Sequence, residues 1–287
     1  MDYIIFSDSA ADIDTLSAKK GDIHFFTMRY SVGDDMRICT KRESNEDIKE
    51  FYDGQRKGDL TKTTMISPAG YIEGAEPYLS KGQSILYLSL SSGLSSTYDS
   101  AIIAQKELES KYPEQTFLPF DTLSATGGMG VLLERAIANR NKGMSITENY
   151  NDLAETRKKL KVWFFVQDLN YLKRGGRIST TAAVVGTLLG IKPVLIINSE
   201  GKLENTDKKR GLNSAVSLLA EKYSELYDSS IETPAYLVET DNTEGGDKFL
   251  QLMEQNSKQI HIKRCTLSPI IGAHTGPELT GICFLGK

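Results

Sequence analysis

Residues 168–202, DLNYLKRGGRISTTAAVVGTLLGIKPVLIINSEGK, decide the fold, because they combine a turn, a small-residue helix and a buried strand. Gly175 and Gly176 permit backbone angles that other residues avoid. Ser179 and Thr180 then supply side chains that cap a following helix. The first third of this stretch therefore predicts a turn that leads directly into a helix start.

The rest of the stretch is apolar. Residues 182–191 carry no charge, and residues 193–198 are apolar and rich in β-branched side chains. The second run is typical of a strand covered on both faces. We expect this helix and strand to wall an apolar space. An ordinary α/β core is the alternative interpretation.

Strand and helix patterns alternate along the whole chain. Strands are predicted over 3–6, 25–32, 84–90, 116–120, 162–166, 193–198, 235–240, 260–267 and 281–285. Helices are predicted after Ser44, from Ser67, from Ser95 to Lys111, over 128–140, after the capping-box residue Ser145, over 211–227 and over 246–255.

This alternation predicts an α/β fold of two domains, 1–160 and 161–287. The first is expected to be a Rossmann-like parallel sheet with helices on both faces. A predicted hairpin at 199–202 favours a mixed sheet in a two-layer second domain.

Composition restricts the classes of function. The chain has 287 residues, a net charge of −4 and scattered basic residues, which argues against nucleic acid as a partner. Cys39, Cys265 and Cys283 are widely spaced without a CxxC pair, as expected of reduced thiols. No signal-peptide or membrane-span pattern is present, so we expect a cytoplasmic protein without stable membrane insertion.

Polar motifs follow several predicted strands, at the edge where open α/β sheets bind ligands. They are Ser7-Asp8-Ser9, Lys62-Thr63-Thr64, Ser91-Ser92-Gly93 with Ser95-Ser96-Thr97, and Asp121-Thr122. Hydroxyl groups beside helix N-termini are suited to a carboxylate or phosphate. The alternative interpretation is that each of these residues only caps a helix.

His274 is the strongest single candidate for a functional side chain. It lies in the glycine-bracketed segment 271–277, predicted as a loop between the last two strands, where an imidazole could donate to an anion. A loop histidine bonded only to backbone is the alternative. GxSxG, P-loop, GxGxxG and HExxH patterns are absent, so no catalytic residue, cofactor or metal site is predicted.

Taken together, these motifs resemble the DegV family from the first strand to the last. The resemblance rests on Ser7-Asp8-Ser9-Ala10, Lys62-Thr63-Thr64, residues 91–98, Asp121-Thr122, Gly128 with Gly130, residues 169–179, residues 189–193 and His274-Thr275-Gly276-Pro277. It implies two α/β domains with a long-chain fatty acid held in an apolar tunnel between or within them, and we place the site between them. It also implies a non-enzymatic subunit that presents the acyl carboxylate to the ATP-binding subunit of a fatty acid kinase, a step of phospholipid metabolism.

The resemblance also assigns residues to roles. Thr63, Ser95 with Ser92 nearby, and His274 would hold the carboxylate, while Arg177 and Arg210 would contact the kinase. Arg210 is expected at the start of the 211–227 helix. Glu278 stands where the family has glycine, and its charge would oppose a carboxylate unless it points to solvent.

The acyl tunnel is expected along the uncharged run and the strand after it, because small side chains there leave room. Its candidate residues are Ala182, Ala183, Gly186, Leu189 and Ile191. Two other functions remain open from sequence. One is a hydrolase or acyltransferase that uses Ser95 or Ser92 with His274, and the other is a protein that only scaffolds partners.

Overall fold

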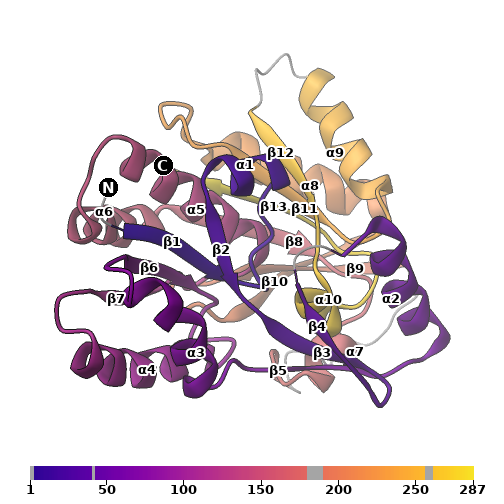
Figure 1. Ribbon diagram of the computed structural model, residues 1–287. Coiled ribbons are helices and arrows are strands. Elements are labelled where there is room, and N and C mark those ends of the chain that lie inside the picture. Colours follow the sequence, from indigo (N-terminus) through magenta and orange to yellow (C-terminus); the bar gives the residue numbers. More distant parts are fainter. Residues whose placement is uncertain (1–2, 41–42, 180–189, 256–260) are drawn as a thin grey trace.

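The computed structural model describes residues 3–40, 43–179, 190–255 and 261–287 of the chain (Figure 1). The first half is built on a parallel sheet with strand order β2-β1-β6-β7. Its strands are β1 (Tyr3–Asp8), β2 (Ile23–Phe26), β6 (Ser84–Ser89) and β7 (Phe117–Asp121). Every residue of β1 is buried, as expected where helices cover both faces of a parallel sheet.

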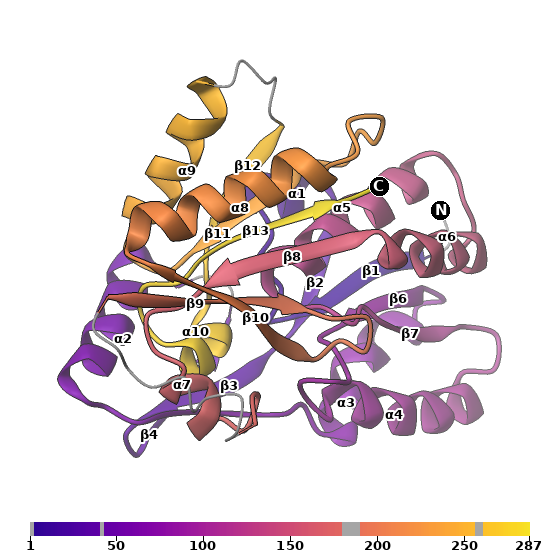
Figure 2. The same ribbon diagram turned by 180° about the vertical axis from the view of Figure 1, so that it is seen from behind.

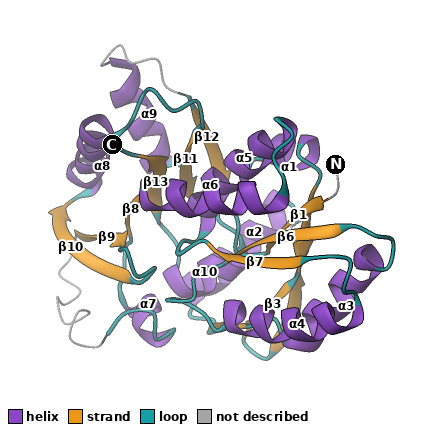
Figure 3. Ribbon diagram, turned by 90° about the vertical axis from the view of Figure 1, so that its left-hand side faces the viewer, coloured by secondary structure: helices purple, strands orange, loops and turns teal. Residues whose placement is uncertain are grey.

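Helices cover both faces of this sheet, as the sequence predicts (Figure 3). The pair α3 (Pro68–Leu79) and α4 (Thr97–Lys111) lies on one side, and α5 (Thr126–Asn141) with α6 (Ile146–Lys158) on the other. The short α1 (Thr15–Lys20) follows β1. Ser67 caps α3 by accepting from the Gly70 backbone N–H at 3.2 Å, so the predicted start of that helix is confirmed.

The second half contains a six-stranded mixed sheet with order β10-β9-β8-β13-β11-β12. Only β11 and β12 pair in parallel among its described strands. The strands are β8 (Leu160–Phe165), β9 (Ile191–Ile197), β10 (Leu203–Arg210), β11 (Ala235–Glu239), β12 (Ile262–Thr266) and β13 (Thr280–Leu285). The predicted hairpin joins β9 to β10. α8 (Leu212–Leu226) and α9 (Glu244–Gln255) pack on this sheet.

α5 lies between the two sheets, and its glycines explain how they come so close. A Cβ atom at Gly127 would lie 2.5 Å from the Val238 side chain of β11, and one at Gly130 would lie 2.7 Å from the Asp12 carbonyl oxygen. Neither position has room for a side chain. The glycine cluster at the start of α5 thus serves packing between two sheets.

A third, antiparallel sheet of order β4-β3-β5 completes the fold. It contains β3 (Met28–Val32), β4 (Asp35–Cys39) and β5 (Thr61–Thr64), and α2 (Asn45–Lys57) connects the last two. Residues 25–32 are therefore not one strand, and that prediction was wrong. The buried Ser9 hydroxyl accepts from the Met28 N–H at 3.0 Å and donates to the Cys39 carbonyl at 2.7 Å, which holds β3 in its own sheet.

Candidate ligand-binding site

A cavity lies where the three sheets and the start of α5 meet. Together with the solvent space at its opening, it contains about 730 Å³ that no protein atom fills. Most of its described wall is aliphatic. The apolar lining comprises Met28, Leu90, Leu94, Ala125, Val162, Phe164, Leu172, Ile197, Leu203, Val238, Ile270, Ile271 and Leu279.

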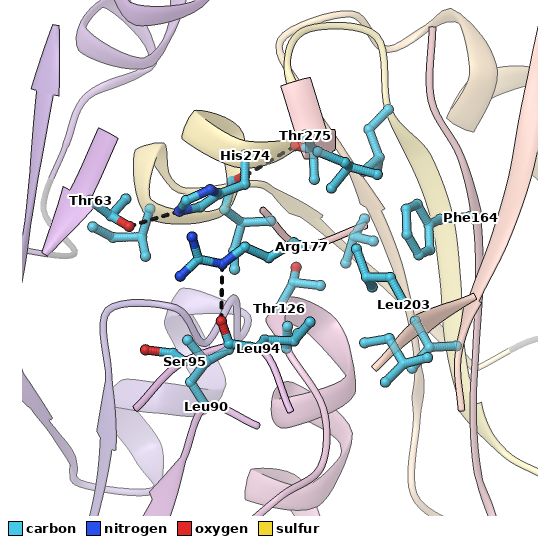
Figure 4. A pocket seen from close by; sticks show the side chains of 18 of the residues that line it. Thr63, Leu90, Leu94, Ser95, Thr126, Phe164, Arg177, Leu203, His274 and Thr275 are labelled. Atoms are coloured by element: carbon cyan, nitrogen blue, oxygen red, sulfur yellow. Dashed lines mark hydrogen bonds between the residues drawn. The ribbon is translucent and has the colours of Figure 1, made fainter. Parts of the chain in front are cut away.

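Polar side chains gather at one end of the cavity (Figure 4). Thr63 from β5, Ser95 from the loop before α4, Arg177 and His274 lie there, whereas Phe164 and Leu203 lie at the opposite end. Thr63 Oγ1 and His274 Nε2 are 2.7 Å apart and share a hydrogen bond. Residues separated by more than two hundred positions in the sequence thus form one polar head on an apolar chamber.

His274 lies on a short helix, α10 (Pro269–Thr275), and not in a loop, so that prediction was wrong. Pro269 at the first helical position favours the helix. Burial, and then the charge of Arg177, lower the pKa of His274 to about 4. The ring is therefore neutral at neutral pH. Its Nδ1 is buried and has no hydrogen-bond partner among the residues that the structure describes.

Arg177 is placed by the turn that follows the short helix α7 (Asn170–Arg174). Gly176 adopts φ of 70°, which favours glycine, and the Arg177 backbone N–H donates to the Leu172 carbonyl at 2.9 Å. The guanidinium Nε donates to the Leu94 carbonyl at 3.0 Å, and a second nitrogen donates to the Gly175 carbonyl.

Arg177 places a positive charge at the polar end of the cavity, and no acidic residue of the described chain pairs with it. Burial lowers the pKa of Arg177, but a guanidinium stays charged in proteins. The neutral His274 and the charged Arg177 therefore leave the polar end of the cavity with a net positive charge, which favours an anion.

The sequence profile of the DegV family, described as an uncharacterised protein family, matches residues 3–287. A DegV domain-containing protein of Clostridium perfringens is 34% identical over 99% of this chain and 97% of its own length. The chain belongs to the DegV family.

Solved structures of the family share its fold. A Thermotoga maritima protein with a fatty acid binding function has 28% identity and a TM-score of 0.83, with full coverage of both chains. DegV of Bacillus subtilis, a fatty acid binding protein, has 25% identity and a TM-score of 0.83, again with full coverage of both. The predicted DegV fold class, a parallel sheet with a mixed second sheet, is confirmed.

Three of the four predicted carboxylate ligands of this DegV-family chain line the cavity, namely Thr63, Ser95 and His274. Ser95 Oγ donates to Thr97 Oγ1 at 3.0 Å and accepts from the Thr97 N–H at 3.2 Å. Ser92 is exposed and is not part of the lining; its backbone N–H donates to Asp121 Oδ1 at 3.2 Å. The structure therefore does not bring Ser92 to the site.

The predicted tunnel residues cannot be located in the same way. Ala182, Ala183, Gly186 and Leu189 lie outside the described residues. Ile191 begins β9 and is not among the lining residues. The described apolar wall includes residues of β3, β8, β9, β10, β11, α7 and α10. Sequence reasoning missed Val162 and Phe164, which share one face of the predicted strand 162–166 because side chains alternate along a strand.

Two further charged residues lie away from the cavity lining. Arg210 is the exposed last residue of β10 and not the start of a helix, because Gly211 caps α8. Glu278 adopts φ of 63°, and its carboxylate lies 3.5 Å from Lys192 Nζ. Glu278 is thus held beside a lysine, and its charge does not line the cavity.

The described residues meet the requirements of neither a metal site nor a membrane-spanning helix. Across the described ranges, no group of His, Cys, Asp and Glu side chains could hold a metal ion. None of the helices within those ranges is long and apolar enough to cross a bilayer.

Proposed function

We propose that this protein binds a long-chain fatty acid in the cavity and presents its carboxylate to a fatty acid kinase. The observation that carries the proposal is a partly buried guanidinium, without an acidic partner among the described residues, at the polar end of an otherwise apolar chamber. A fatty acid supplies both missing parts, namely an anion for Arg177 and a hydrocarbon chain for the aliphatic wall.

The energetics favour such a ligand. Each buried methylene contributes about 0.8 kcal/mol, so the chain supplies most of the affinity. The carboxylate loses water on burial and needs donors in return. Arg177, His274 with Thr63, and Ser95 can provide them, and each charge-assisted bond contributes roughly 1.5–3 kcal/mol. Relatives with a fatty acid binding function, from T. maritima and B. subtilis, support the same ligand class.

The kinase part of the proposal rests on the motif resemblance and on Arg210. An exposed arginine at the end of β10 can pair with acidic groups of a partner in fixed geometry. The DegV-family chain itself would act as a carrier, with phosphoryl transfer performed by the ATP-binding subunit. Arg177, which the resemblance also assigns to the kinase, lines the cavity, so we give it a role at the carboxylate.

A serine hydrolase or acyltransferase is less well supported by the geometry. A base that activates serine must lie within hydrogen-bond reach of it and be oriented by a third group. His274 Nε2 instead bonds Thr63, and Ser95 bonds Thr97. With a pKa of about 4, His274 would also be a weak base.

The test is to extract the purified protein and identify bound lipid by mass spectrometry. We expect about one fatty acid per chain, no turnover of generic ester substrates, and rebinding of a fatty acid after delipidation. The test variant is Arg177→Met, which keeps an apolar stem but removes the charge and should lose most of the bound lipid. Protein that carries no fatty acid and binds none after delipidation would contradict the proposal.

A further inference from the structure

The sheet around the cavity has a gap between two neighbouring strands. The β8–β9 ladder consists of three residue pairs and ends at Trp163 opposite Ile196. Both strands continue beyond that point, β8 back to Leu160 and β9 on to Ile197. Ile197 pairs there with Leu203 of β10. Figure 2 shows β8 and the β9–β10 hairpin diverging from this point.

An outer groove with about 1,220 Å³ of open space lies over the gap. Its apolar surface includes Leu160, Trp163, Ile196 and Leu226, and basic side chains such as Lys161 lie beside them. Such a surface can accept hydrocarbon, since its Trp and Leu side chains are partly exposed to solvent.

Two residues belong to both spaces. Val162 and Ile197 line the outer groove and also the inner cavity. On the inner side they adjoin Phe164 and Leu203, the residues opposite the polar end (Figure 4). β8 and β9 do not pair at Val162 and Ile197, so no ladder hydrogen bonds join the two strands at the residues that the cavity and the groove share.

We infer that Val162 and Ile197 form the end wall that limits acyl chain length, and that the β8–β9 gap behind them is a second opening. The inference rests on the proposed function and makes it more specific. An acyl chain that is short enough for the cavity has its methyl end against these side chains. A longer chain would have to displace them and continue over Trp163 and Leu226, which becomes favourable when the wall is trimmed.

The experiment compares four proteins after delipidation: wild type, Val162→Ala/Ile197→Ala, Ile197→Phe and Ile196→Ala. Ile196→Ala is the control, because it removes the same atoms as the Ile197→Ala part of the double variant, but from the neighbouring residue, which lines the groove and not the cavity. Each protein is titrated with palmitic, stearic, arachidic and behenic acid, and thermal unfolding checks that it is folded.

We expect the double alanine variant to gain affinity for the longer acids relative to palmitic acid, by roughly fourfold for each additional buried methylene. Ile197→Phe should shift the preference toward shorter acids, and Ile196→Ala should keep the wild-type order. The inference is overturned if the folded double variant keeps the wild-type order of affinities for the four acids, or if Ile196→Ala shifts that order as much as the double variant does. Either result leaves fatty acid binding intact. If the double variant does not fold, an unchanged order in Ile197→Phe overturns the inference. Wild type that binds none of the acids overturns the proposed function as well.

Discussion

His274 is an uncharged hydrogen-bonding group in a positively charged setting. Burial and Arg177 keep its ring neutral, so it does not need a proton from solvent to take part in binding. An imidazole protonated at Nε2 donates to Thr63, whose own hydroxyl hydrogen then remains available for an anion. The buried ring can therefore donate to Thr63 while the Thr63 hydroxyl donates to a ligand carboxylate.

Replacing His274 with alanine should weaken fatty acid binding by about tenfold or more, because Thr63 loses the imidazole that keeps its hydroxyl hydrogen available for the carboxylate. His261→Ala is the control, since that histidine is exposed and is not among the cavity-lining residues. Titration calorimetry with one fatty acid measures the difference. Equal affinity in wild type and His274→Ala would remove His274 from the carboxylate site.

The lowered pKa of His274 also predicts how stability depends on pH. The unfolded chain binds a proton at this histidine near pH 6.5, whereas the folded chain binds it only near pH 4. Stability without ligand should therefore fall as pH drops through this window, by roughly 2–3 kcal/mol from this group. Urea unfolding of wild type and His274→Gln at both ends of the window isolates the effect. A loss as large in His274→Gln as in wild type would mean that other groups cause it.

The sequence pointed to hydroxyl and imidazole groups that line the cavity, but it gave no sign that Arg177 lines it too. Thr63, Ser95 and His274 stood out because they follow strands or lie among glycines. Arg177 carries no such mark, since an arginine after a glycine pair is equally compatible with a solvated surface. Its position in the cavity depends on a hydrogen bond to the Leu94 carbonyl, which is a tertiary contact and leaves no local pattern.

At the scale of elements, the turn after α7 fixes the position of α10. A Cβ atom at Gly175 would lie 2.4 Å from His274 Nδ1, so the turn and the imidazole ring pack in direct contact. Gly175 has φ of −70°, which other residues adopt easily. Glycine is thus required there by the neighbouring ring and not by backbone geometry.

Gly175→Ala should push the His274 ring away from Thr63 and reduce fatty acid affinity by about tenfold. The change tests position alone, because every hydrogen-bonding group is kept. Gly70→Ala is the matched control, since its new Cβ would meet Ile66 and Ser67 at ordinary contact distances of 3.4 and 3.5 Å. Binding by calorimetry and thermal unfolding would be measured together. Unchanged affinity in folded Gly175→Ala would show that the ring tolerates displacement.

The elements that sequence predicted well are those whose signals are local. The capping boxes at Ser44–Asp47 and Ser145–Glu148 both form, because a cap needs only residues three apart. β5 and β10 were not among the predicted strands. Their sequences, TKTT and LENTDKKR, are polar. β5 becomes a strand by pairing with β3, and β10 by pairing with β9. Polar edge strands of this kind have a weak hydrophobic period.

The whole molecule brings together residues that no local pattern connects. Thr63 comes from the three-stranded sheet, Ser95 from the loop between β6 and α4, and His274 from the helix before β13. The alternation of elements predicted the fold class. It could not predict that α5 would lie between two sheets, because that depends on close packing at Gly127 and Gly130. The domain boundary near residue 160 remains a prediction.

Arg177 and Arg210 should respond differently to charge reversal, because one lines the cavity and the other is exposed at the end of β10. Arg177→Glu should lose both the bound fatty acid and acyl phosphate formation, since a carboxylate would then face a carboxylate. Arg210→Glu should keep full lipid occupancy but lower the rate of acyl phosphate formation with a fatty acid kinase by tenfold or more, because a reversed charge at an interface slows association.

The measurement uses the lipid-loaded protein, the kinase subunit and ATP, at concentrations well below saturation and at two salt concentrations. The control is Lys142→Glu, which makes the same change in net charge at the exposed end of α5. If the kinase docks through Arg210, Arg210→Glu should form acyl phosphate more slowly than wild type while Lys142→Glu should not. Added salt should then reduce the difference in rate between Arg210→Glu and wild type. A wild-type rate in Arg210→Glu, with Arg177→Glu still lipid-free, would leave the carboxylate site intact and place the kinase contact on another surface.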